Sequence, residues 1–102
     1  MMGKHIQPDL ILTTLPSLHA VRAFVAAAKY QSFTRAAESL CVSQAAISRQ
    51  IKELEDNLKT DLFTRTGRSV ALTSAGKLFF QTAQQSLCNI YQATDQIRSI
   101  RK

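Results

Sequence analysis

The segment after Ser43 carries the pattern that most restricts how this chain can fold. Apolar side chains recur there at intervals of four, three and four residues, at Ile47, Ile51, Leu54 and Leu58. This spacing puts all four on one face of an α-helix, and such a face must pack against a core. Because Ser43 is a favourable N-cap, the pattern predicts a helix from Gln44 to Leu58.

Two more helices are predicted ahead of this one. Ser17 can cap a helix that ends near Tyr30, with apolar residues at helical spacing along one face. Thr34 can cap a short helix in which Ala37 is small enough for a close helix crossing, and Val42 then plugs the turn. A short helix, a tight turn and a longer helix form the helix-turn-helix plan.

The outer face of the third helix is small and cationic at its start. Ala45, Ser48, Arg49 and Lys52 lie away from the apolar stripe, whereas the acidic residues of this helix come later. Gln44, Ala45 and Ser48 leave this face narrow enough to enter the major groove of a DNA duplex. The pattern therefore favours a helix that reads DNA over one that only fills a core.

Two short alternating runs follow, from Leu62 to Arg65 and from Ser69 to Leu72, and Gly67 lies between them. They predict a β-hairpin with glycine at its tip. Arg65 and Arg68 would project from this hairpin, and no acidic residue stands near them in the sequence. Such a hairpin is typical of a wing that grips phosphate or enters the minor groove, although a solvated hairpin with incidental arginines is the alternative.

Thr73 or Ser74 is predicted to cap a last, long helix that runs to about Arg98 or beyond. Its inner residues follow a heptad seam, at Phe80, Ala83, Leu87, Ile90, Thr94 and Ile97. A single helix cannot hide so much apolar surface from water. We therefore expect the seam to pair with a second copy of the chain. Packing on its own domain is the alternative, and Leu78 and Phe79 are expected to pack inward.

Composition narrows the class of partner. The chain has 13 Lys and Arg against 7 Asp and Glu, a net charge of +6, so anions and above all nucleic acids are favoured. Two cysteines and two scattered histidines offer no metal cluster, and we expect no cofactor. The longest apolar run is too short for a membrane span or a signal peptide, which predicts a cytoplasmic protein without a membrane partner. Residues 1–14 carry no sustained period and are predicted to be a loose leader, with a turn docked on the body as the alternative.

Several of these segments resemble the N-terminal DNA-binding domain of LysR-type transcriptional regulators. The matching stretches are residues 32–40 (SFTRAAESL), 42–55 (VSQAAISRQIKELE), 62–65 (LFTR) and 72–76 (LTSAG). Within that family, the chain looks most like the regulators of glycine cleavage and of β-lactamase induction. The resemblance implies a mainly α fold. A winged helix-turn-helix of three helices and a β-hairpin wing would span residues 15–73, and a linker helix for dimerisation would span residues 74–102.

The resemblance also implies a role for each site residue. The helix after the turn enters the major groove, and six of its residues face base edges or flanking phosphates: Ser43, Gln44, Ala45, Ser48, Arg49 and Lys52. Glutamine can pair bidentately with adenine, and arginine with guanine. Thr34 and Arg35 suit a backbone phosphate, since a helix N-terminus offers free N–H groups. Arg65 and Arg68 serve the wing.

The implied partner is double-stranded DNA with an interrupted inverted repeat that has T and A at its ends, bound by a homodimer. Members of the family continue into a C-terminal domain that binds a small effector. This chain stops at Lys102, so we expect no effector-binding domain or effector site in it. The family usually has glycine where Lys59 stands. Lys59 must therefore adopt a left-handed conformation, or the helix must end differently.

Two other classes of function compete with DNA reading. The chain could be a truncated interaction module that pairs through its last helix with a longer relative and modulates it, and mixed dimers with weak DNA binding would distinguish this case. The third class is an enzyme. No nucleophile stands beside a plausible base and no glycine-rich phosphate loop is present, so the sequence argues against catalysis.

Overall fold

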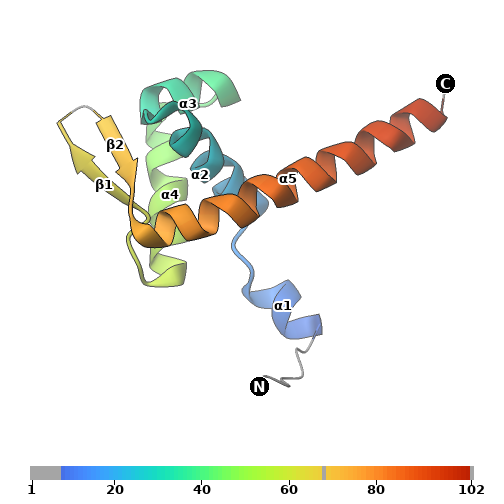
Figure 1. Cartoon of the computed structure of the whole chain (residues 1–102), viewed down its shortest axis with the longest axis horizontal. Coiled ribbons are helices and arrows are strands. Elements are labelled where there is room, and N and C mark those ends of the chain that lie inside the picture. The colour runs from blue at the N-terminus through green and yellow to red at the C-terminus, as the bar shows by residue number, and fades with distance from the viewer. Residues whose placement is uncertain (1–7, 68, 102) are drawn as a thin grey trace.

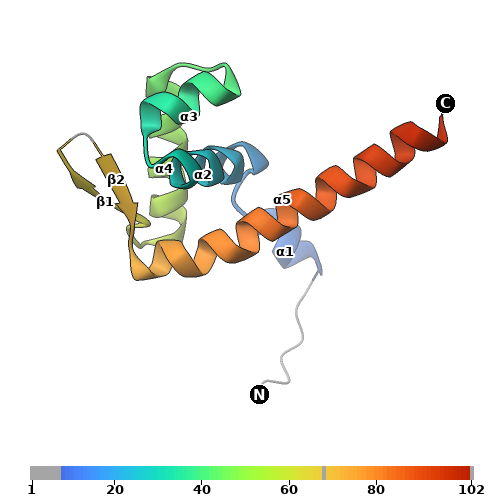
Figure 2. The same cartoon turned by 45° about the horizontal axis from the view of Figure 1, so that its top comes forward.

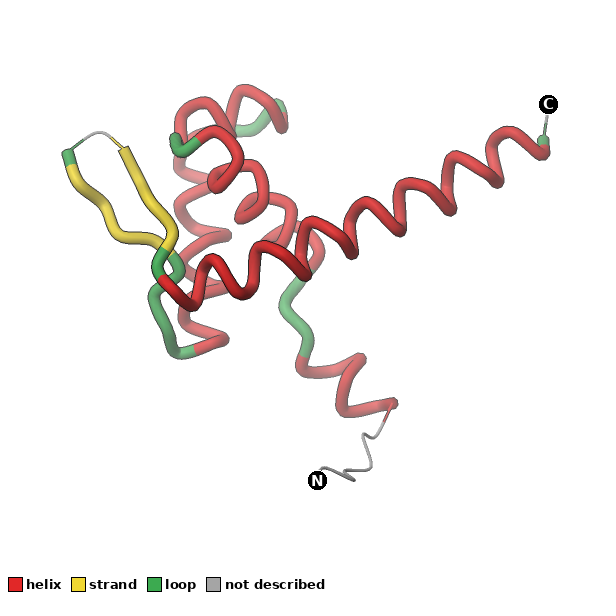
Figure 3. Tube along the Cα trace, viewed as in Figure 1, coloured by secondary structure: helices red, strands yellow, loops and turns green. Residues whose placement is uncertain are grey.

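The computed structural model of the chain describes residues 8–67 and 69–101, and within them the fold is mainly helical (Figure 1, Figure 3). This confirms the predicted class of a winged helix-turn-helix followed by a long helix. The elements in chain order are α1 (Pro8–Thr14), α2 (Leu18–Tyr30), α3 (Phe33–Leu40), α4 (Gln44–Leu58), β1 (Phe63–Thr66), β2 (Ser69–Leu72) and α5 (Ser74–Ile100).

Helices α2, α3 and α4 pack on one another and form the body of the domain. The hairpin of β1 and β2 stands beside this body, and α5 begins directly below the hairpin (Figure 1, Figure 2). The first half of α5 crosses the body along α2, whereas its C-terminal half extends into open space in both views. The shape therefore combines a compact helical body, a wing and a projecting helix.

Hydroxyl side chains set the starts of the four longer helices. Each N-cap oxygen accepts a hydrogen bond from a backbone N–H three residues further on, at Ser17, Ser32, Ser43 and Thr73. Such caps satisfy donors that the first helical turn leaves free. The sequence-based assignment of Thr34 as the cap of the short helix is wrong, because Ser32 takes that position and bonds the N–H of Arg35 at 3.1 Å.

Three helices end in a left-handed residue that is not glycine. Gln31, Cys41 and Lys59 have φ angles of 51°, 58° and 55° at the ends of α2, α3 and α4. Lys59 therefore adopts the conformation that glycine takes more readily, and the helix keeps its expected end at Leu58. The N–H of Lys59 bonds the carbonyl of Asp56 at 3.2 Å, which closes the last turn of α4.

Phe24 of α2 lies at the centre of the core and is fully buried. Its ring centroid is 5.4 Å from those of Phe63 on β1 and Phe79 on α5, and 6.3 Å from that of Phe80. These edge and tilted contacts are the geometry that aromatic rings prefer. They fasten the wing and α5 to the helical body, so one cluster holds together three parts of the fold.

Two apolar residues that were expected inside lie at the surface. Val42 is 45% exposed in the turn between α3 and α4, where its N–H bonds the carbonyl of Ala37. Leu78 is 75% exposed because Phe79 and Phe80 take the inward positions of the first turns of α5. The predictions that Val42 plugs the turn and that Leu78 packs inward are therefore wrong.

The leader is also more ordered than expected. Residues Pro8–Thr14 form helix α1, in which the hydroxyls of Thr13 and Thr14 donate to the carbonyls of Asp9 and Leu10. The sequence did not predict this helix, and residues 1–7 lie outside the described structure. The apolar side chains of α1 face solvent, so the sequence has no buried apolar stripe at helical spacing that would predict this helix.

The hairpin forms as the sequence predicts. Phe63 pairs with Leu72 and Arg65 pairs with Val70 in an antiparallel register, and Gly67 at the tip has a φ of 58°. Phe63 and Val70 are buried against the body. Their burial leaves the other face of the two strands to solvent. Nowhere in the described parts of the chain is a helix both long and apolar enough to cross a lipid bilayer.

Candidate nucleic-acid interface

The start of α4 presents a polar, cationic face to solvent. Gln44, Ala45, Arg49 and Lys52 are exposed, and Ser48 between them is half-buried. The opposite face is buried, with Ile47, Ile51 and Leu54 at 1% exposure or less. The apolar stripe thus fixes the rotation of the helix, and this rotation turns the predicted contact residues outward.

Two residues of this face have partners within the chain. The Ser43 hydroxyl is exposed and accepts a hydrogen bond from the N–H of Ala46 at 3.1 Å, so it caps α4. The Lys52 ammonium lies 3.6 Å from the Asp56 carboxylate, but both side chains are mostly exposed. An exposed ion pair of this kind is weak, so Lys52 remains free to contact another anion.

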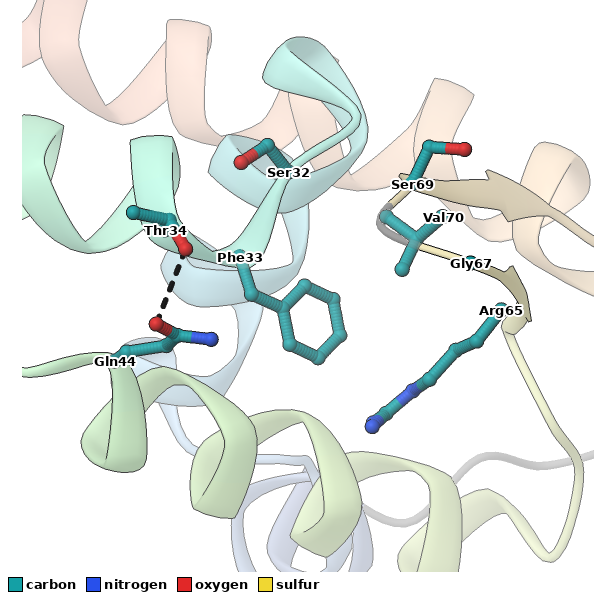
Figure 4. A pocket seen from close by; sticks show the side chains of 8 residues that line it. All are labelled: Ser32, Phe33, Thr34, Gln44, Arg65, Gly67, Ser69 and Val70. Atoms are coloured by element: carbon teal, nitrogen blue, oxygen red, sulfur yellow. Dashed lines mark hydrogen bonds between the residues drawn. The ribbon is translucent and has the colours of Figure 1, made fainter.

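The wing lies on the same side as the start of α4, and a notch separates them (Figure 4). We use "the notch" for the surface hollow lined by Ser32, Phe33, Thr34, Gln44, Arg65, Gly67, Ser69 and Val70. No acidic residue is among these described lining residues. The notch therefore lies between the N-terminal ends of α3 and α4 and the wing residue Arg65. It offers hydrogen-bond donors to an anion.

Arg65 is held across the notch by an aromatic ring. Its guanidinium lies 4.7 Å from the ring centroid of Phe33, the first residue of α3. A cation over an aromatic face is attracted to it, and the stacking limits the freedom of a long side chain. Sequence reasoning missed the role of Phe33, although the adjacent Ser32 cap and Thr34 mark this helix start.

A second hydrogen bond crosses from α3 to α4. The Thr34 hydroxyl donates to the Gln44 side-chain oxygen Oε1 at a distance of 3.0 Å, and both residues are exposed (Figure 4). Thr34 is the second residue of α3 and Gln44 is the first of α4. Two of the predicted contact residues are therefore bound to each other.

A basic cluster lies beside the start of α3. The Arg35 guanidinium is 5.1 Å from the ring centroid of Tyr30, and the Lys29 ammonium is 5.2 Å from the same ring. A hydrogen bond with Ser39, followed by the positive charges of Lys29 and Arg35, lowers the pKa of the Tyr30 phenol. The sequence analysis identified Arg35 as a contact residue. It did not identify Lys29 and Tyr30, which are the last two residues of α2.

The predicted heptad seam of α5 divides into two parts. Ala83 is buried in the core and Phe80 packs against it, so the first residues of the seam serve the domain itself. Leu87 and Thr94 are half-buried, whereas Ile90 and Ile97 are 48% and 58% exposed. Only the later part of the seam is free for another partner.

The remaining predicted site residue is Arg68, which lies outside the described residues. Across residues 8–67 and 69–101, no group of three or more His, Cys, Asp or Glu side chains is placed to hold a metal ion. The exposed features are therefore a helix face, a wing arginine and a basic cluster.

Comparisons with known proteins agree with this geometry. A family model described as "Bacterial regulatory helix-turn-helix protein, lysR family" matches residues 18–77. The chain is 44% identical over 92 residues to a "Glycine cleavage system transcriptional activator homolog" of Haemophilus influenzae, covering 90% of this chain and 31% of that protein. It is 47% identical over 85 residues to the "Glycine cleavage system transcriptional activator" of Escherichia coli K12, covering 83% and 28%. The chain thus spans about a third of the length of these curated relatives.

Solved structures give the same result. A crystal structure of the BenM DBD with benA site 1 DNA superposes with a TM-score of 0.76 at 40% identity, covering 84% of this chain and 97% of that one. The CbnR DBD in complex with DNA gives 0.73 at 31% identity, covering 84% and 99%. The fold and the exposed face of α4 define a winged helix-turn-helix. The chain belongs to the LysR family of bacterial regulatory helix-turn-helix proteins, and the matched part is the LysR-type DNA-binding domain.

Proposed function

We propose that this chain binds double-stranded DNA in a sequence-specific way, as the DNA-reading domain of a LysR-type transcription regulator in the cytoplasm. The observation that carries the proposal is the start of α4. Its outer face is polar and mostly exposed and carries the cations Arg49 and Lys52, while its other face is buried in the core. The relatives are transcriptional regulators and two matched structures contain DNA. These findings also favour a binding protein without cofactor over an enzyme.

In this proposal α4 is the recognition helix and lies in the major groove. Gln44, Ala45, Ser48 and Arg49 face base edges, and Ser43 and Lys52 face the flanking phosphates. Arg65 on the wing and Arg35 at the start of α3 contact the phosphate backbone. Arg68 shares the wing contact. The stacking of Arg65 on Phe33 and of Arg35 on Tyr30 supports these roles, because both guanidinium groups are held in place before DNA arrives.

We further propose that two copies pair through α5. The exposed Ile90 and Ile97 support this pairing, since isolated apolar side chains on a projecting helix gain most from a second chain. A dimer sets two recognition helices on two half-sites of an interrupted inverted repeat with T and A at its ends. If the helix instead pairs with a longer relative, as in an interaction module, mixed dimers form and DNA binding by this chain alone is weak.

The test is a fluorescence-anisotropy titration of a labelled duplex carrying an interrupted inverted repeat, beside a scrambled duplex, over a salt series. Site-preferring binding is expected, with a slope of log affinity against log salt near −5 for about six phosphate contacts. Arg49→Ala lowers affinity for the preferred duplex by about ten- to a hundredfold. Arg22→Ala removes the same charge outside the named interface and is the matched control.

Equal binding of both duplexes with no loss in Arg49→Ala contradicts the proposal. An equal loss in Arg22→Ala and Arg49→Ala also contradicts it, because binding then depends on net charge and not on the face of α4. Mixing the chain with a longer relative of the family and finding only mixed dimers that bind poorly favours the interaction module.

A further inference from the structure

The hydrogen bond between Thr34 and Gln44 determines which part of the Gln44 amide is offered to DNA. We infer that Thr34 is a positioning residue that makes Gln44 a hydrogen-bond donor toward the bases, so that Gln44 selects guanine or thymine and disfavours adenine. This inference rests on the proposed function and adds to it the chemical preference of one recognition residue.

The first step is the geometry of the amide. Oε1 of Gln44 lies 3.0 Å from the Thr34 hydroxyl, which donates to it. With the oxygen turned toward α3, the amide nitrogen Nε2 points away from Thr34, on the side where Phe33 and Arg65 lie (Figure 4). A threonine hydroxyl can donate or accept, and in this structure it donates to Oε1, so the amide is held with its oxygen on the Thr34 side.

The second step is the chemistry of base edges in the major groove. A bidentate pair with adenine needs the glutamine oxygen to accept from the adenine amino group while the nitrogen donates to N7. In this chain Oε1 is turned toward Thr34 and one of its two lone pairs already accepts from that hydroxyl, whereas both N–H groups of Nε2 are free of partners among the described residues. Guanine N7 and O6 and thymine O4 are acceptors that need only those donors.

The third step concerns what lies beside Gln44. Arg65 lines the same notch and has only donors, and no described lining residue carries a carboxylate. The notch therefore presents donors from both sides. An acceptor-rich base edge or a phosphate oxygen suits it, whereas a base amino group meets no carboxylate there. The side-chain acceptors among the described lining residues are Oε1, which already bonds Thr34, and the hydroxyls of Ser32, Thr34 and Ser69.

This arrangement also changes the expected role of Thr34. Its hydroxyl has one proton, and that proton is used in the bond to Gln44. Phosphate oxygens only accept, so the Thr34 hydroxyl cannot donate to a phosphate while it holds Gln44. In place of the phosphate contact that the sequence suggests for Thr34, the structure assigns it an action through Gln44.

The experiment uses the full chain and a set of labelled duplexes with an interrupted inverted repeat, in which each half-site position carries each of the four bases. Gln44→Ala identifies the position that Gln44 reads, because the preference there disappears. At that position the unmodified chain is expected to prefer guanine or thymine. Thr34→Val removes the hydroxyl but keeps the branched side chain, and discrimination against adenine there falls about three- to tenfold.

Two further measurements separate this role from others. Thr34→Ser keeps a hydroxyl donor and restores the preference, and the salt slope is the same for Thr34→Val as for the unmodified chain. In the free protein, the side-chain amide signal of Gln44 in ¹⁵N relaxation measurements is rigid for the unmodified chain and Thr34→Ser. It is mobile for Thr34→Val.

Several results overturn the inference. One is an adenine preference at the Gln44 position of the unmodified chain. Another is a Thr34→Val variant whose salt slope weakens by about one while its base preferences stay the same, which identifies Thr34 as a phosphate contact. A site preference that Gln44→Ala leaves intact removes this inference alone. No preference for any duplex removes the proposed function, and the inference with it.

Discussion

The carboxylate of Glu55 and the backbone N–H of Leu62 lie 2.8 Å apart, and the same oxygen, Oε2, also accepts from the N–H of Phe63 at 3.2 Å. Glu55 belongs to the last turns of α4, and Phe63 is the first residue of β1. This contact joins α4 to the wing. The position of the wing beside α4 therefore depends on this half-buried carboxylate as well as on the packing of Phe24 against Phe63.

Removing this carboxylate is expected to destabilise the fold. Glu55→Ala leaves two backbone donors without their charged partner, which costs about 2 kcal/mol of the free energy of unfolding. Urea unfolding followed by circular dichroism measures the change. Glu53→Ala removes a neighbouring, exposed carboxylate and is expected to change stability by less than about 0.5 kcal/mol. Equal effects of the two substitutions would show that Glu55 does not tie the wing to α4.

A substitution at Lys59, which ends α4 in a left-handed conformation, is expected to stabilise the fold. Its φ of 55° is favourable for glycine and costs another residue about 1 kcal/mol, so Lys59→Gly raises the free energy of unfolding by about that amount. Asn57→Gly is the control, because glycine at a helical position in the last turn of α4 lowers stability by about 0.3 kcal/mol relative to asparagine. Thermal unfolding of both variants gives the sign directly, and a loss of stability in Lys59→Gly contradicts the explanation.

Gly67 and Gly76 are required for different reasons, and replacing each by alanine distinguishes the two reasons. A Cβ at Gly76 would lie 2.2 Å from the backbone oxygen of Leu62, whereas a Cβ at Gly67 meets nothing within 4 Å. Gly76→Ala therefore forces the wing away from α5 and costs about 1–3 kcal/mol, despite the higher helix propensity of alanine. Gly67→Ala costs about 1 kcal/mol because of its positive φ alone. Chemical denaturation measures both, and a stabilised Gly76→Ala variant would refute the steric argument.

The Tyr30 phenol offers a test of the basic cluster. Its hydrogen bond with Ser39 and the charges of Lys29 and Arg35 hold its pKa below the usual value of 10. The lower folded pKa means that ionised Tyr30 favours the folded state at high pH, and this contribution is lost as pH falls through the folded pKa. In a Tyr91→Phe background, absorbance titration at alkaline pH reports Tyr30 alone. Ser39→Ala raises the pKa, and an unchanged titration contradicts the assigned cause.

The sequence was sufficient to predict the helical body and the wing. The stripe from Ile47 to Leu58 sets the rotation of α4, and the alternation around Gly67 sets the hairpin, because both patterns record burial against a core. The outward direction of Arg49 and Lys52 follows from that rotation. The predicted roles of these residues toward DNA stay a prediction until binding is measured.

Other features have no local pattern. Helix α1 was not predicted because its apolar side chains face solvent. The N-cap of α3 was assigned to Thr34 because threonine is also a good capping residue, although Ser32, two positions earlier, is the cap. The bond between Thr34 and Gln44 joins residues ten positions apart through the geometry of the turn. The division of the heptad seam could not be predicted either, because Ala83 and Ile97 fit the same spacing. They differ in that Ala83 packs against the helical body, whereas Ile97 lies beyond it and is exposed.

That division predicts which part of α5 controls assembly. Ile90 is 48% exposed and contributes little to the core of a single chain, so Ile90→Asp is expected to dissociate the dimer while leaving the helical signal and unfolding midpoint of the monomer nearly unchanged. Gln92→Asp adds the same charge two residues away on the opposite side of the helix and keeps the dimer. Sedimentation equilibrium at several concentrations measures both. A chain that is already monomeric at the highest concentration, or a dimer that survives Ile90→Asp, would show that α5 does not pair along this seam.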